Sequence, residues 1–244
     1  MRKVLLFLLF TISISIQAQT VRIAAAGNLR YILDEIKANY LKTNPKANIM
    51  VSLGSSGALF QQITNGANFD IFMAADKIYP DKLKAQGIVA GDVKTYAFGK
   101  LVIWSKTLDV SQGLNILTSK EVNKIAIAKP EVAPYGNRAI ECLRYYKLFD
   151  NVKDKIVYAD NIAQAAQFAQ TGNAEIGFIA LALAMGPEMK GSYFVLDTKS
   201  YKPVEQAMVL VKNWQSNPEA GKFMKYVLSA ACKPIFEKFG FIVP

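Results

Sequence analysis

The sequence predicts an α/β fold with two lobes, and three observations support this. Short apolar runs alternate with amphipathic stretches over residues 20–88, and a second alternating set with its own apolar positions covers residues 125–180. Such alternation predicts a mostly parallel sheet flanked by helices. Two further apolar runs, at about 95–104 and 203–211, connect the two sets. We therefore expect one sheet in each lobe and two crossover strands between the lobes.

The first set contains three strand–helix pairs. Residues 29–41 have apolar side chains at helical spacing, and Asn28 just before them is a good helix N-cap by residue type. Asn65 and Gly66 are typical of the end of a helix. The predicted strands are 20–26, 48–53 and 70–74, and the predicted helices are 29–41, 55–63 and 76–88.

The second set follows a longer apolar run. Strands are predicted at 95–104, 125–128, 157–160 and 175–180, a loop at 130–136, and helices at 137–148 and 162–171. A last strand at 207–211 and one long amphipathic helix at 220–240 would return the chain to the first lobe. The expected division is therefore a signal peptide at 1–18, lobe 1 at 19–95 plus 206–244, and lobe 2 at 96–205.

The N-terminal segment has the pattern of a secretory signal peptide. Arg2 and Lys3 supply positive charge, residues 4–16 are mostly apolar, and Ala18 offers a small residue for cleavage. An uncleaved anchor is the alternative, but the apolar run is short for a membrane span. No cysteine lies near the cleavage point, which argues against a lipoprotein. We expect a soluble protein that is exported, in the periplasm.

The composition excludes several classes of function. The chain has no histidine, which removes a Ser-His-Asp triad, a Cys-His pair and nearly all catalytic zinc sites. The formal net charge is +10, but the lysines are spread along the chain and not clustered with aromatic residues as nucleic-acid binding requires. Cys142 and Cys232 each lie in an apolar helical pattern, so buried thiols are favoured over one disulfide. We expect neither an enzyme nor a nucleic-acid-binding protein.

Four predicted helix starts have the residues of an anion site. They lie near Asn28, at Ser55, Ser56 and Gly57, at Pro134, Tyr135 and Gly136, and at Asn161 and Ile162. The first four N–H groups of a helix have no intrahelical acceptor, and that end carries about half a positive charge. Several such ends around one cleft would bind an anion without lysine or arginine.

Each helix start also has a plainer interpretation. Serine and asparagine are common N-caps, and a tyrosine at a loop often packs half-buried on a lobe edge. A nucleophilic serine would lack both a histidine base and the Gly-x-Ser-x-Gly turn. Asp70 and Asp76 would lie roughly 20 Å apart by strand rise, too far to share a ligand, and are expected to be turn and cap residues.

Together these motifs resemble the periplasmic molybdate-binding proteins of ABC transporters, within the type 2 periplasmic binding protein fold. The resemblance covers nearly all of the mature chain. It rests on segments 24–29 (AAAGNL), 55–59 (SSGAL), 69–76 (FDIFMAAD), 129–136 (KPEVAPYG) and 236–241 (FEKFGF).

The resemblance implies which residues bind the ligand. They are Asn28 and Ser56, with Gly27 close by, from the first lobe, and Tyr135 and Ile162, largely through backbone N–H groups, from the second. Ser55, Gly57, Asn161 and Ala180 are weaker candidates. Many family members have a tyrosine ligand where Ala180 aligns, and Tyr135 would compensate for its loss here.

The implied function is capture of molybdate, and of tungstate, for delivery to an ABC permease, by a monomer with no cofactor and no bound metal cation. A rigid ring of neutral donors would reject the smaller sulfate, because each N–H left unpaired costs about 1–3 kcal/mol. The alternatives are a binding protein for another solute, such as sulfate, a metal ion or an organic acid, and an exported enzyme on the same scaffold.

Overall fold

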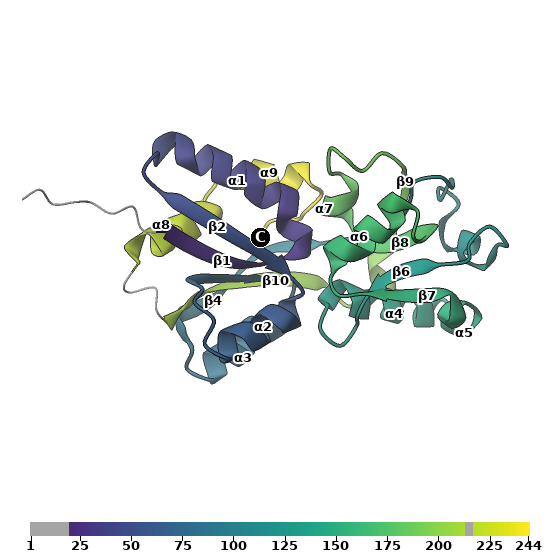
Figure 1. Ribbon diagram of the computed structural model, residues 1–244, viewed down its shortest axis with the longest axis horizontal. Helices are drawn as coiled ribbons and strands as arrows, with labels where there is room; N and C mark the ends of the chain where they lie inside the picture. The colour runs from purple at the N-terminus through teal and green to yellow at the C-terminus, as the bar shows by residue number, and fades with distance from the viewer. Residues whose placement is uncertain (1–19, 213–216) are drawn as a thin grey trace, which may run out of the picture.

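The computed structural model describes residues 20–212 and 217–244, which form two lobes, each built on one five-stranded sheet (Figure 1). The predicted signal peptide at 1–18 lies outside the described residues. Within 20–212 and 217–244, no helix has both the length and the apolar character needed to cross a membrane.

The first sheet has the strand order β2–β1–β3–β10–β4. Its strands are β1 Thr20–Ala26, β2 Asn48–Gly54, β3 Ile71–Ala74, β4 Val89–Gly99 and β10 Val204–Val211. Strands β1, β2 and β3 are parallel, and β10 is antiparallel to both β3 and β4. Strands β1, β2, β3 and β4 therefore run in one direction. Strand β10, which the chain enters from the other lobe, runs in the opposite direction.

Helices cover both faces of the first sheet (Figure 1). They are η1 Gly27–Leu29, α1 Arg30–Thr43, α2 Ser56–Thr64, α3 Ile78–Ala85, α8 Pro218–Val227 and α9 Lys233–Lys238. Alternate side chains of β1 enter different layers: Ile23 and Ala25 pack with α1, α8 and α9, whereas Ala24 packs with α2 and α3. Burial on both faces explains why β1 is a nearly continuous apolar run.

The second sheet has the strand order β7–β6–β8–β5–β9. Its strands are β5 Leu101–Ser105, β6 Ile125–Ala128, β7 Ile156–Ala159, β8 Ile176–Ala180 and β9 Ser192–Val195. Strands β6, β7 and β8 are parallel, and β5 is antiparallel to β8 and β9. This sheet repeats the arrangement of the first, so the prediction of two mostly parallel sheets is confirmed.

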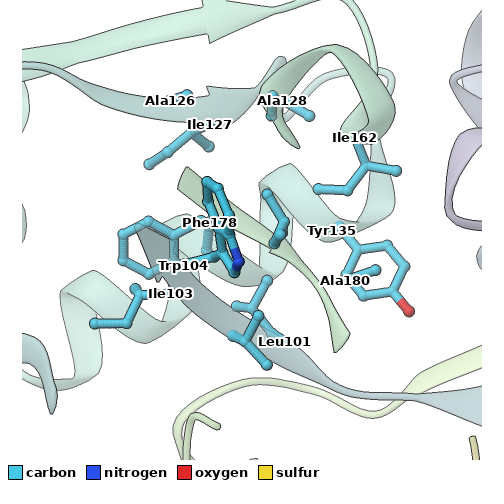
Figure 2. Close-up of a cluster of buried hydrophobic side chains, with 14 of the residues drawn as sticks. Leu101, Ile103, Trp104, Ala126, Ile127, Ala128, Tyr135, Ile162, Phe178 and Ala180 are labelled. Carbon is cyan, nitrogen blue, oxygen red and sulfur yellow. The ribbon is translucent and has the colours of Figure 1, made fainter. Parts of the chain in front are cut away.

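The second lobe has its own core. Its helices are η2 Gly113–Thr118, α4 Pro134–Tyr145, α5 Phe149–Val152, η3 Lys153–Lys155, α6 Ile162–Thr171, α7 Leu181–Ala184 and η4 Thr198–Ser200. Trp104 and Phe178 are fully buried at the centre of the core, and Tyr135 and Ile162 lie to one side of them (Figure 2). The hydroxyl group of Tyr135 is directed away from this cluster.

The crossover near residue 100 differs from its prediction. The apolar run 95–104, expected as one strand, is divided between β4 of the first sheet and β5 of the second, with Lys100 between them. Apolar periodicity alone does not reveal such a break, because the end of β4 is buried or half-buried and β5 is fully buried, so that the two halves form one apolar run. The expected lobe boundaries at 95/96 and 205/206 fall inside β4 and β10, which pair with each other beside this crossover.

The single C-terminal helix predicted at 220–240 is wrong. The chain forms two helices there, α8 and α9, separated by a turn. Pro234 lies in the first turn of α9. Proline tolerates that position but would break the hydrogen bond and clash in the middle of a longer helix.

Smaller differences concern short elements. Helix α4 begins at Pro134 and not at residue 137, because proline is well suited to the first helical position. Helix α3 begins at Ile78 with Asp76 accepting from the Tyr79 N–H, so Asp76 precedes the helix that it was expected to open. Strand β9 and helices α5 and α7 were not predicted; each has only four residues. Cys142 and Cys232 are both buried and free.

Candidate anion-binding site

The carboxyl ends of parallel strands from both sheets meet around one cavity. Its walls follow β1, β2 and β3 in the first lobe and β6 and β7 in the second, which is where open α/β sheets place ligands. The cavity is small, with a volume of about 10 Å³ open to the centre of a water-sized sphere. It is lined by Ala26, Gly27, Asn28, Gly54, Ser55, Ser56, Ala75, Ala133, Pro134, Tyr135 and Ile162.

Ser56 begins helix α2 and its side chain is fully buried. Its hydroxyl oxygen accepts a hydrogen bond from the Ala75 N–H at 2.9 Å, so its own proton remains for another acceptor. Ser55 is the N-cap, and its oxygen accepts from the Ala58 N–H at 3.4 Å. The two adjacent serines thus have different functions: one caps the helix and the other offers a donor to the cavity.

Asn28 is 1% exposed in the short helix η1 after β1. Its Nδ2 atom lies 3.0 Å from Oε1 of Gln206, and its Oδ1 atom is buried without a hydrogen-bond partner in the described chain. An unsatisfied buried polar atom costs about 1–3 kcal/mol. Asn28 therefore has hydrogen-bonding capacity left over at the wall of the cavity.

The second lobe contributes backbone donors. Tyr135 is the second residue of α4, after a proline that has no N–H, and Ile162 is the first residue of α6. Helix geometry gives neither N–H an intrahelical acceptor. Among residues 20–212 and 217–244, no backbone carbonyl outside their own helices accepts from the N–H groups of Tyr135 and Ile162. The same holds for the N–H group of Ser56. Three helix N-termini from two lobes thus present N–H groups at this cavity.

Every residue that lines the cavity is uncharged. Charged side chains line two grooves that flank the cavity between the lobes. One groove contains Asp76, Lys82, Glu131 and Arg138. The other contains Arg30 and Glu188. The described part of the chain has no cluster of three or more Cys, Asp or Glu residues that would suit a metal ion. The chemistry offered is hydrogen-bond donation to an anion.

The structure brings most of the predicted site residues together. Gly27, Asn28, Ser55, Ser56, Tyr135 and Ile162 all line the cavity. Gly57, Asn161 and Ala180 do not line it.

Each of the three excluded residues has a structural reason. Gly57 donates its N–H to Val132 O of the other lobe at 2.9 Å. The Asn161 side chain caps α6, accepting from the N–H groups of Ala163 and Gln164. Ala180 ends β8 and is fully buried in the core of the second lobe.

Gln206 was missed by the sequence analysis. It lies in β10, is fully buried, and contacts Asn28, Tyr96 and Tyr135 through hydrogen-bonding groups. A glutamine in the otherwise apolar run 206–211 is the signal that could have found it, since buried amides need partners.

Asp76 lies at the groove between the lobes. Burial raises the pKa of Asp76 to about 6, against the opposing effects of its hydrogen bond from the Tyr79 N–H and of the Arg138 charge. Its folded-state pKa lies above the ordinary value of 3.8, so folding takes up a proton between about pH 4 and pH 6. The stability that protonation supplies is present below this window and is lost as the pH rises through it.

Asp76→Asn is therefore expected to change how stability depends on pH. Asparagine keeps an oxygen that can cap α3 but does not ionise. The parent should lose on the order of 3 kcal/mol between pH 4 and pH 7 from this group, and the variant should not. Urea unfolding at several pH values measures this. Parallel curves for parent and variant would show that Asp76 does not have the raised pKa.

The fold defines a class of protein: two α/β lobes, joined by two crossover strands, that enclose a small site between them. The chain belongs to the family of bacterial extracellular solute-binding proteins, whose family model matches residues 21–242. The description of this family agrees with the export that the N-terminal sequence predicts.

Relatives of known name cover nearly the whole chain. The molybdate-binding protein ModA of Azotobacter vinelandii is 35% identical over 229 residues, which are 92% of this chain and 90% of that protein. The protein of the same name from Rhodobacter capsulatus is 33% identical, covering 90% of this chain and 86% of its own length. Both relatives are named as binding proteins.

The fold is also that of a solved structure. The periplasmic molybdate-binding protein of Azotobacter vinelandii superposes with a TM-score of 0.86 at 31% identity, covering 92% of this chain and 99% of that structure. The chain therefore has the type 2 periplasmic binding protein fold.

Proposed function

We propose that this protein captures molybdate between its two lobes outside the cytoplasm, in the periplasm, and delivers it to an ABC permease. The single observation that carries the proposal is the cavity between the lobes, lined by neutral donors and by no charged side chain. The names of the relatives supply the identity of the anion.

Neutral donors suit a fully deprotonated tetrahedral dianion. Such an anion needs only donors, and the cavity offers the hydroxyl of Ser56, the amide of Asn28, and N–H groups at three helix starts. A protonated phosphate would need an acceptor as well. Tungstate has nearly the same size and charge as molybdate, so we propose that it binds too.

The lobes already contact each other around the cavity. Besides the bond from Gly57 to Val132, the Tyr79 hydroxyl donates to Glu131 O at 3.2 Å, and Gln206 Nε2 lies 3.0 Å from the Tyr135 hydroxyl. We propose that the two lobes close by hinge motion on the anion, and that the protein acts as a monomer with no cofactor.

Thermal unfolding of the purified mature protein with an anion panel tests this function. Molybdate at about a thousand times its dissociation constant should stabilise the fold by about 4 kcal/mol, which is roughly 8–16 °C in Tm. Tungstate should act alike, and sulfate and phosphate should shift the Tm by less than about 2 °C, because a smaller or protonated anion leaves donors or lone pairs unpaired.

Three other outcomes would change this conclusion. An equal shift with sulfate would identify a general oxyanion-binding protein, and no shift with any of the four anions would refute the proposal. Turnover of a substrate that disappears in Ser56→Ala would indicate an enzyme on this scaffold.

A further inference from the structure

Gln206 is a buried polar residue beside the anion cavity that does not itself line it. Its amide lies among three side chains. Oε1 is 3.0 Å from Asn28 Nδ2 and 2.8 Å from the Tyr96 hydroxyl oxygen, and Nε2 is 3.0 Å from the Tyr135 hydroxyl oxygen. Asn28 and Tyr96 belong to the first lobe and Tyr135 to the second, so Gln206 joins the two halves of the site.

The proton of Tyr96 decides how this network is arranged. The Tyr96 hydroxyl oxygen is 2.9 Å from Ala74 O and 2.8 Å from Gln206 Oε1. Both partners are oxygen atoms that only accept, and a phenol has one proton. One of the two contacts is then an oxygen–oxygen approach with no proton between the atoms, which is unfavourable in a buried site.

Turning the Gln206 amide by 180° removes this conflict. The nitrogen and oxygen of an amide have nearly the same shape, so protons and not packing decide the orientation. Tyr96 then donates to Ala74 O, and Gln206 Nε2 donates one proton to Tyr96 and one to Asn28. Gln206 Oε1 accepts the proton of Tyr135.

The 180° rotation of the Gln206 amide also determines the orientation of the Asn28 amide. The atom of Asn28 that meets Gln206 Nε2 must be its oxygen, so the N–H₂ group occupies the other position. That position is buried and has no partner in the described chain. An anion in the cavity would therefore meet the two N–H bonds of the Asn28 amide. It would not meet the amide oxygen, whose partial negative charge would repel it.

We propose that Gln206 is a positioning residue that holds the Asn28 amide with its N–H₂ group toward the bound anion. This inference rests on the proposed function. It also assigns Tyr135: its hydroxyl proton is committed to Gln206, so Tyr135 offers the anion its backbone N–H. Burial holds the pKa of both Tyr96 and Tyr135 well above the usual value, which keeps the two phenols protonated.

Close packing keeps the Gln206 amide in place. A Cβ atom at Gly99, on the crossover between the lobes, would clash with the Tyr135 hydroxyl oxygen and would lie 2.6 Å from Gln206 Nε2. The glycine therefore permits the approach of both groups to the backbone. Such packing leaves the amide few alternatives except the 180° turn.

Neutron diffraction from a deuterated crystal grown with molybdate tests the assignment directly. The expected result is a deuteron between Tyr96 and Ala74 O, and two deuterons on the Asn28 atom that faces the anion. Deuterons of Asn28 that point to Gln206, with molybdate bound in the cavity, would overturn this inference and leave the proposed function intact. Absence of molybdate from the cavity would overturn both.

Calorimetry on two tyrosine variants gives a second, independent test. Tyr96→Phe removes the hydroxyl that fixes Gln206, and we expect molybdate affinity to fall about fivefold, the equivalent of one neutral hydrogen bond. Tyr40→Phe is the matched control, because Tyr40 is a buried tyrosine of the same lobe that bonds Glu219 instead. Equal affinities of the two variants would contradict the positioning role of Gln206.

Discussion

Asn28→Asp is expected to abolish molybdate binding, with a loss of affinity of more than about a thousandfold. The change replaces an amide by a carboxylate of the same shape at a residue that is 1% exposed and lines the cavity. Two unit charges about 4 Å apart repel by roughly 4 kcal/mol at the effective dielectric of a protein site, and a dianion doubles this. Such an energy exceeds what one hydrogen bond contributes.

Titration calorimetry at pH 8 measures this loss, with circular dichroism to verify folding. Asn28→Ser is the control, because serine keeps a neutral donor, and we expect it to lose about 10-fold to 100-fold. Binding to Asn28→Asp within tenfold of the parent would mean that the anion does not lie next to Asn28.

Gly57→Ala is expected to weaken molybdate binding while leaving the fold of each lobe intact. The new Cβ atom would lie 2.6 Å from the Tyr79 hydroxyl oxygen and 2.9 Å from the Cα atom of Val132, in the backbone of the other lobe. The lobes would have to separate at this point. Forcing a methyl group into a packed contact costs about 1–3 kcal/mol, which corresponds to roughly 5–150-fold in affinity.

The stability of the protein without molybdate should not fall. Gly57 lies in α2, and alanine favours a helix over glycine by about 1 kcal/mol, so the Tm without molybdate should stay the same or rise. The same change in a Tyr79→Phe background separates the two contacts, since the hydroxyl is then gone and the backbone contact remains. Unchanged affinity in Gly57→Ala would show that closing the lobes here is not required for binding.

Local patterns allowed much of the fold and of the site to be predicted. The helix starts at Ser55 and Asn161 have capping residues whose side chains bond N–H groups two or three positions ahead, and both caps are found. The alternation of strands and helices predicted two sheets, because the strands of each alternating set pair within one lobe. The cavity then follows from where parallel strands end.

Features that depend on distant parts of the chain were not predictable in the same way. Gln206 is separated by 178 positions from Asn28, by 110 from Tyr96 and by 71 from Tyr135. No local pattern encodes such a network. The change of sheet at Lys100 is hidden for a similar reason, because the end of β4 and the whole of β5 are both apolar although they belong to different sheets. The break before Pro234, by contrast, was visible in the sequence.

A crystal structure grown with molybdate, with the metal located by its anomalous scattering, tests the central claim most directly. The account predicts one strong anomalous peak in the cavity between the lobes, with oxygen atoms within hydrogen-bond distance of Asn28, Ser56 and the N–H groups of Tyr135 and Ile162. A peak at lysine or arginine side chains in one of the flanking grooves, and none in the cavity, would contradict it.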